Sequence, residues 1–127
     1  MMINVNISLA IVHNTIVGAF EGGSNHWLHT AKLIEGYRKL DDNLVWWGHI
    51  EVLEQPFKFE VTFDDPNEDE GSATGKRTIT NVDLTRALTL MAAKSPRHFS
   101  DLVSEGDDAI THDVFMQYLI LDDVVYG

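Results

Sequence analysis

The sequence predicts an α+β protein in which an antiparallel sheet of three to five strands is covered on one face by about four helices. The clearest strand signal, a strict alternation of apolar and polar residues, lies in the first half of the chain at 57–63. Helical periodicity and helix-capping residues dominate the chain after residue 80. Strands followed by helices are typical of α+β proteins, and 127 residues suffice for a single domain, 1–127.

The first segment carries two periods in succession. Alternating asparagine and apolar residues predict a short strand at about 2–6. Apolar residues on one helical face then predict a helix at about 9–21. Ser8 or Asn6 is the expected N-cap, because a short polar side chain accepts a hydrogen bond from a free backbone N–H of the first turn.

Four further runs are candidate strands. Residues 26–35 predict one strand, and the alternating run 57–63 predicts another. A three-residue turn separates 45–53 from 57–63, so we expect these two runs to pair as a hairpin. Beyond an acidic flexible loop at about 64–75, residues 76–80 predict a third strand of the same sheet.

The last part of the chain is predicted to be helical. A helix over 82–94 carries an apolar stripe and is capped by Thr80 or Asn81. A serine followed by Pro96 predicts a second helix, because proline is favoured at the first helical position. A final helix is expected to be capped by Thr111.

The chain is strongly acidic, since 20 Asp and Glu residues against 9 Lys and Arg give a net charge of −11. The acids gather in three clusters, 60–70, 101–108 and 122–123. Nucleic acids and anionic membranes are bound through Lys and Arg, so we expect neither as a direct ligand. We expect instead a protein partner, with a basic or nucleic-acid-binding surface. No apolar run approaches the roughly 20 residues that cross a bilayer, and cysteine is absent, which is typical of a cytoplasmic protein.

The stretch AFEGGSNHW, residues 19–27, raises the question of a phosphate-binding loop. Such a loop follows a strand and opens a helix, whereas here the expected helix precedes the glycines. Helix termination by the glycines is therefore the favoured interpretation. Ser24 and His26 do not specify a catalytic triad, because the spacing implies no acid. A pocket for a small ligand or nucleotide at Gly22–Trp27 remains a second hypothesis. Its candidate ligand-binding residues are Ser24, Asn25, His26 and Trp27.

Metal binding finds no support in the residue pattern. His26 and His29 are three apart in a predicted strand, so their rings point to opposite faces. The acidic loop 64–75 fails as a calcium-binding EF-hand loop, because Glu70 stands where glycine is required and Lys76 where a bidentate glutamate is required. We therefore predict no metal, no cofactor and no catalytic residue, and we favour a protein that is not an enzyme.

Two adjacent tryptophans lie in the predicted strand 45–53. Adjacent side chains on a strand point to opposite faces, so at least one of Trp46 and Trp47 is expected to leave the main core. That indole packs under a loop or forms an interface. The predicted partner-binding residues are Asp64, Asp65, Glu68, Asp69, Glu70 and Trp46.

The stretches IVGAFEGGSNHW and SPRHFSDLVSEGDDAITHDVFMQYLILDDVVYG, with the helix before Ser95, cover roughly half of the chain. Together they resemble a family of small proteins without assigned activity that tailed bacteriophages and prophages encode. The family's motifs are EGGSN-aromatic-Trp and a terminal D-V-F-x-Q…V-Y-G. This chain departs at His26, where the family usually has tyrosine. The resemblance implies a viral or prophage origin and the cytoplasm of a bacterial host, and it assigns no catalytic residue.

These observations lead to one functional expectation and two alternatives. We expect a non-catalytic phage accessory protein that binds a host or phage macromolecule, by host-defence inhibition or by acidic mimicry of DNA. The first alternative is the ligand pocket at Gly22–Trp27. The second is an oligomeric structural or assembly protein.

Overall fold

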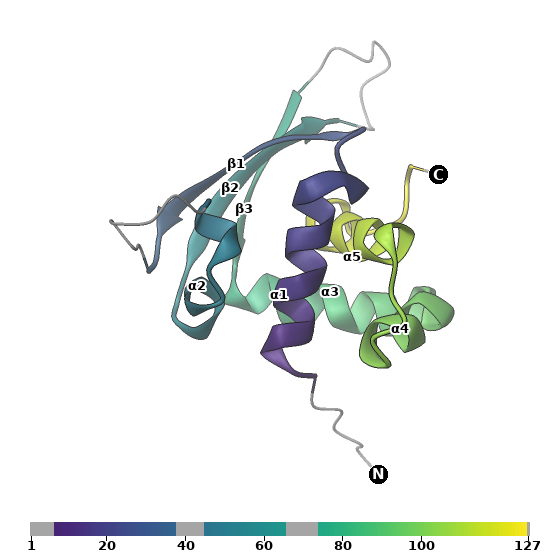
Figure 1. Cartoon of the computed structure of the whole chain (residues 1–127). Helices are drawn as coiled ribbons and strands as arrows, with labels where there is room; N and C mark the ends of the chain where they lie inside the picture. Colours follow the sequence, from purple (N-terminus) through teal and green to yellow (C-terminus); the bar gives the residue numbers. More distant parts are fainter. Residues whose placement is uncertain (1–6, 38–44, 66–73, 127) are drawn as a thin grey trace.

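The computed structural model describes residues 7–37, 45–65 and 74–126. Three antiparallel strands form one sheet in the order β1 (Leu28–Glu35), β2 (Lys58–Asp64) and β3 (Thr74–Thr80). Helices cover one side of this sheet (Figure 1). The predicted α+β class, with helices on one face of an antiparallel sheet, is confirmed.

Most of the helical layer follows the sheet in the sequence. Residues 9–18 form α1 before the first strand, and a four-residue helix, α2 (Glu51–Glu54), precedes β2. The rest of the layer is α3 (Asn81–Lys94), α4 (Pro96–Val103) and α5 (Ala109–Leu121). Within the residues that the structure describes, no helix is both long and apolar enough to cross a membrane.

The central strand is the one whose alternation predicted it. In β2, Phe59, Val61 and Phe63 are buried against the helices, and the residues between them are partly exposed. Phe59 is in register with Leu33 of β1 and Ile79 of β3, both also buried. Apolar side chains therefore cross all three strands in one row on the helix-covered face.

Helix α5 forms the centre of the helical layer, and every side chain from Val114 to Ile120 is buried. Its mostly apolar circumference explains this position, because a helix that is apolar all round must be covered on all sides. The prediction that Thr111 caps α5 is wrong. Asp108 is the N-cap and accepts a hydrogen bond from the Thr111 backbone N–H at 3.0 Å. The hydroxyl of Thr111 instead lies 3.2 Å from His98 Nδ1.

The other predicted caps are confirmed. Ser8 caps α1, and its Oγ accepts from Ala10 N at 3.2 Å. Thr80 caps α3 in a reciprocal arrangement in which its backbone N–H donates to Asp83 Oδ2 at 2.8 Å. Pro96 occupies the start of α4 as expected.

The predicted strand 45–53, and its hairpin with 57–63, are wrong. Residues 46–48 form a short 3-10 helix that leads into α2, and β2 pairs with β1 and β3 instead. Both Trp46 and Trp47 contact Phe20, with ring centroids 6.1 and 5.4 Å apart, so they do not face opposite sides. A short apolar run does not distinguish a strand from a helical turn, and tertiary packing decided here.

Two further expectations concern segments at the limits of the described ranges. The predicted strand at 2–6 lies outside them, as do Glu68, Asp69 and Glu70. Both ends of the predicted loop 64–75 belong to strands, because β2 and β3 remain in register as far as Asp64 and Thr74.

Candidate functional site

The turn that carries the EGGSN motif is built on close backbone packing. After α1 the chain continues as one π-helical turn, Ala19–Gly23, which ends where Ser24 N donates to Ala19 O at 3.0 Å. The order helix, glycines, strand is therefore as predicted. A Cβ on Gly23 would lie 2.9 Å from the carbonyl oxygen of Ala109, so glycine lets the turn touch the start of α5.

A buried carboxylate, Asp113 of α5, organises this turn. The Ser24 hydroxyl and the Trp27 indole N–H both donate to its Oδ1 at 2.7 Å, and Gln117 Nε2 donates to its Oδ2 at 2.8 Å. Asp113 is 9% exposed, and these bonds replace the water that a buried carboxylate loses. On the outer side, His26 Nε2 lies 3.9 Å from Oδ2.

Gln117 extends the network to the end of the chain. Its Oε1 accepts from the backbone N–H groups of Val125 and Tyr126 at 2.7 and 2.9 Å, and its Nε2 donates to Tyr126 O at 3.0 Å. The Tyr126 ring stacks on Trp27 with centroids 5.9 Å apart, and its hydroxyl donates to Asp64 O at 3.0 Å. Burial raises the pKa of Tyr126, and the nearby carboxylates of residues 64 and 65 raise that pKa further.

The four predicted ligand-binding residues divide into two pairs. Ser24 and Trp27 are fully buried, and their polar atoms are bound to Asp113. Asn25 and His26 are exposed on the turn. The structure thus brings Ser24 and Trp27 together around a carboxylate in the interior, while ligand binding at this turn stays a prediction.

Sequence reasoning missed the centre of the network, Asp113 and Gln117. A signal was present, because both are strongly polar residues within the mostly apolar run 113–121 and are spaced i,i+4, on one face. Both also belong to the D-V-F-x-Q motif. The two motifs that carried the family resemblance are therefore in direct contact through their side chains.

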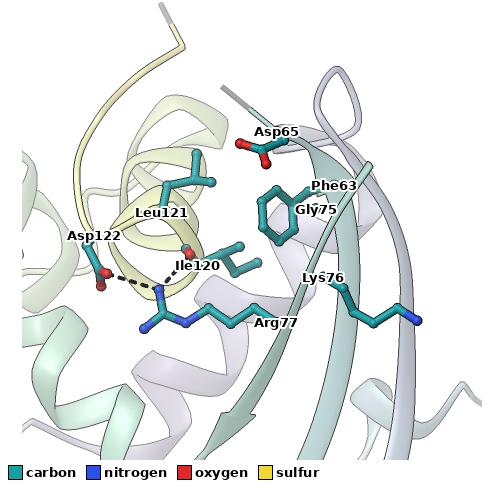
Figure 2. Close-up of a pocket in the computed structure, with 8 residues that line it drawn as sticks. All are labelled: Phe63, Asp65, Gly75, Lys76, Arg77, Ile120, Leu121 and Asp122. Carbon is teal, nitrogen blue, oxygen red and sulfur yellow. Dashed lines mark hydrogen bonds and ion pairs between the residues drawn. The ribbon is translucent and has the colours of Figure 1, made fainter. Parts of the chain in front are cut away.

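An open pocket of about 460 Å³ lies between β3 and the C-terminal end of α5 (Figure 2). The Phe63 ring faces this space, and Gly75 makes room for it, because a Cβ there would lie 2.5 Å from the ring. Lys76 points away from α5. The pocket is lined by Phe63, Asp65, Gly75, Lys76, Arg77, Ile120, Leu121 and Asp122.

Two arginines bind the carbonyl end of α5 beside this pocket. Arg77 Nη1 donates to Ile120 O at 2.7 Å and to Asp122 at 3.1 Å. Arg86 donates to Leu119 O at 2.9 Å and to Asp122 at 2.6 Å. Cations are favoured at this end of a helix, where the last carbonyl groups have no partner within the helix.

The acidic clusters are distributed unevenly around the fold. Asp65 and Asp122 line the same pocket, so the clusters 60–70 and 122–123 adjoin. The cluster 101–108 precedes α5, whose 13 residues span about 20 Å. The charge of Asp122 is offset by two arginines, and Asp64 accepts a hydrogen bond from His29 at 2.6 Å.

Trp46, the predicted partner-binding aromatic residue, is half-buried. Its indole N–H donates to the Ala31 carbonyl at 3.1 Å, and its ring lies 5.0 Å from the ring of Phe59. In the described ranges, no three His, Asp or Glu side chains are grouped so as to hold a metal ion.

A scan against protein-family models, a search of curated proteins and a search of solved structures each found no match.

Proposed function

We propose that this chain is a phage- or prophage-encoded accessory protein that acts in the cytoplasm of a bacterial host by binding a protein, without catalysis of its own. The resemblance of its two motifs to phage proteins supports the origin. A role without catalysis is supported because the polar side chains of the two motifs form hydrogen bonds within the fold. Ser24, Asp113 and Gln117 are all buried and all bonded to one another or to the chain terminus.

The partner surface in this proposal is the acidic end of the sheet. The observation that carries it is cluster 60–70, which contains six acids and no base and whose described acids, Glu60, Asp64 and Asp65, lie on β2 or directly after it. The net charge of −11 attracts basic surfaces over a long range and repels nucleic acid. The partner is therefore a protein with a basic surface, and the acids act by mimicking the charge of DNA toward a nucleic-acid-binding protein.

Affinity capture from host lysate with two variants of equal charge tests this proposal. In the first variant, Asp65, Glu68 and Asp69 are changed to Lys. In the control, the exposed residues Glu21, Glu51 and Glu54, which lie outside the clusters, are changed to Lys. We expect the first variant to lose a partner that the control retains, and we expect double-stranded DNA to elute that partner. Capture at low salt that is equal for both variants would reject the assignment.

A small-ligand site is a second candidate, because the pocket between β3 and α5 has a volume typical of ligand sites. Its apolar side offers the Phe63 ring and Leu121, and its polar side offers Arg77. A melting-temperature screen with nucleotides and organic acids would reveal such a ligand. The shift should disappear in Leu121→Trp, in which the larger side chain fills the pocket, and a shift that persists would place the ligand elsewhere.

A further inference from the structure

The last described residues, 122–126, form a segment without helix or strand, which we call the strap. It leaves the end of α5 and lies over the face of Trp27, the amide of Gln117 and the carbonyl of Asp64, which together we call the strap seat. We propose that the strap seat is a recognition site for a peptide segment of a partner protein that carries an aromatic side chain, and that the strap occupies this site until the partner displaces it. This site adjoins the acidic cluster of the proposed function at Asp64, whose backbone carbonyl belongs to the seat and whose carboxylate belongs to the cluster.

The chemistry of the seat suits peptide main chain in general. All three hydrogen bonds between Gln117 and the strap go to backbone atoms, two N–H groups and one carbonyl. Two adjacent N–H groups converge on one oxygen, so the seat recognises a turned main chain rather than a strand, whose successive N–H groups point to opposite sides. The side chains of Val124 and Val125 are 40% and 48% exposed, so the seat does not select them.

Selectivity in the seat comes from one aromatic position. The Tyr126 ring stacks on Trp27 at an interplanar angle of 19°, and its hydroxyl donates to Asp64 O. Aromatic stacking adds stabilisation beyond the burial of area, and a buried tyrosine hydroxyl requires an acceptor. The preferred occupant is therefore a tyrosine within a segment that adopts the same turned main chain.

The seat does not depend on the strap for its shape. The Trp27 indole N–H and Gln117 Nε2 are both bonded to Asp113, and Asp64 belongs to β2. An incoming peptide would therefore meet donors, acceptors and a ring face that are already fixed. Preorganisation of this kind reduces the entropy that binding costs.

The strap has a fixed anchor at Asp122, an exposed middle and a bonded end at Tyr126. Two arginines hold the Asp122 carboxylate, and this residue has a left-handed backbone with φ of 64°. The next residue, Asp123, lies 3.9 Å from Lys94, and both side chains are exposed. Segments with few buried contacts open locally far more often than the protein unfolds. We infer that the strap pivots just after Asp122.

A fluorescent peptide with the sequence LDDVVYG, residues 121–127 of this chain, is the probe. Its affinity is measured by anisotropy against the full-length wild type and against full-length Tyr126→Ala, whose strap has lost its ring. We expect binding to the variant to be about tenfold or more tighter, because in the wild type the tethered strap competes at high effective concentration. A peptide with alanine in place of its tyrosine is the control and should bind the variant weakly.

Equal affinity of LDDVVYG for both proteins, or no binding to a folded variant, would overturn the proposal. A concentration-dependent dimer of the wild type that Tyr126→Ala abolishes would also overturn it, because the seat would then take the strap of a second copy.

A measurement on the wild type alone guards against a variant that does not fold. The amide hydrogens of Val125 and Tyr126 should exchange at a rate that hardly depends on denaturant, while those of Val114–Ile120 exchange only on global unfolding. Exchange of both groups in one common unfolding event would show that the strap is not released.

Discussion

Replacement of Asp113 by asparagine tests the hydrogen-bond network at its centre. The substitution keeps the shape, and Oδ1 still accepts from Ser24 and Trp27. The new amide nitrogen, however, faces Gln117 Nε2 across 2.8 Å, so two donors meet in a buried site. Rotation of the Gln117 amide relieves this contact only by turning its nitrogen toward the backbone N–H groups of Val125 and residue 126.

Either arrangement leaves one or two buried donors without an acceptor, at a cost of about 1–3 kcal/mol. The free energy of unfolding is measured by urea denaturation with tryptophan fluorescence. For a slope of roughly 2 kcal/mol per molar, a loss of ~2 kcal/mol lowers the urea midpoint by about 1 M. Ser24→Ala, which removes one of the three bonds, should lower the free energy of unfolding by only about 1 kcal/mol.

Asp101→Asn is the matched control, since Asp101 is exposed on α4 and the change removes the same charge. Its effect should stay within about 0.5 kcal/mol. If Asp113→Asn lowers the urea midpoint no more than Asp101→Asn does, the network does not stabilise the fold, and the strap seat is not held in place by it.

Three further predictions concern other parts of the fold. Because the pKa of Tyr126 is raised, its protonated hydroxyl stabilises the fold fully below the ordinary pKa of 10.0, and this contribution is lost as pH rises through the higher folded-state pKa. Ultraviolet difference absorbance should show one tyrosine that ionises at a higher pH than free tyrosine, and Tyr126→Phe should remove this transition. The hydrogen bond from the Thr111 backbone N–H lowers the pKa of Asp108, so this cap stabilises α5 fully above pH 3.8 and weakens as pH falls through the lower folded-state pKa. Asp108→Ala should therefore lower the melting temperature at pH 7, and the melting temperatures of the variant and the wild type should converge in strong acid. Gly18→Ala should cost about 1–3 kcal/mol in calorimetry, because its Cβ would lie 2.1 Å from His112 Nδ1; a wild-type melting temperature would show that this ring moves freely.

The elements that the sequence predicted well are those whose local signals agree with their final contacts. The run 57–63 alternates because one face of β2 is buried, and Thr80 is followed at the right distance by Asp83 to complete a cap. The strand predicted at 45–53 is wrong because the two tryptophans of this run suit a strand as well as they suit a helical turn. Their position is decided by Phe20 and Phe59, which come from distant parts of the chain.

The candidate sites also divide into features that local sequence predicts and features that depend on contacts between distant segments. The turn at 19–27 could be recognised from its glycines, and its place after a helix was correct. The bonds of Ser24 and Trp27 could not be derived, because they depend on the rotation of α5 relative to the turn. The pocket beside Phe63 also required the fold, since it is formed where β3 passes the end of a helix more than 40 residues later in the sequence.

The position of α5 in the chain has a consequence for how the protein is made. The helix at the centre of the core is the last regular element to be synthesised, and Ser24 bonds a residue 89 positions away. Until residues 109–121 have been synthesised, α1, α3 and α4 lack the helix against which all three of them pack. A chain cut short before or within α5 leaves exposed the apolar surface that this helix covers, and it should aggregate more readily than the intact chain.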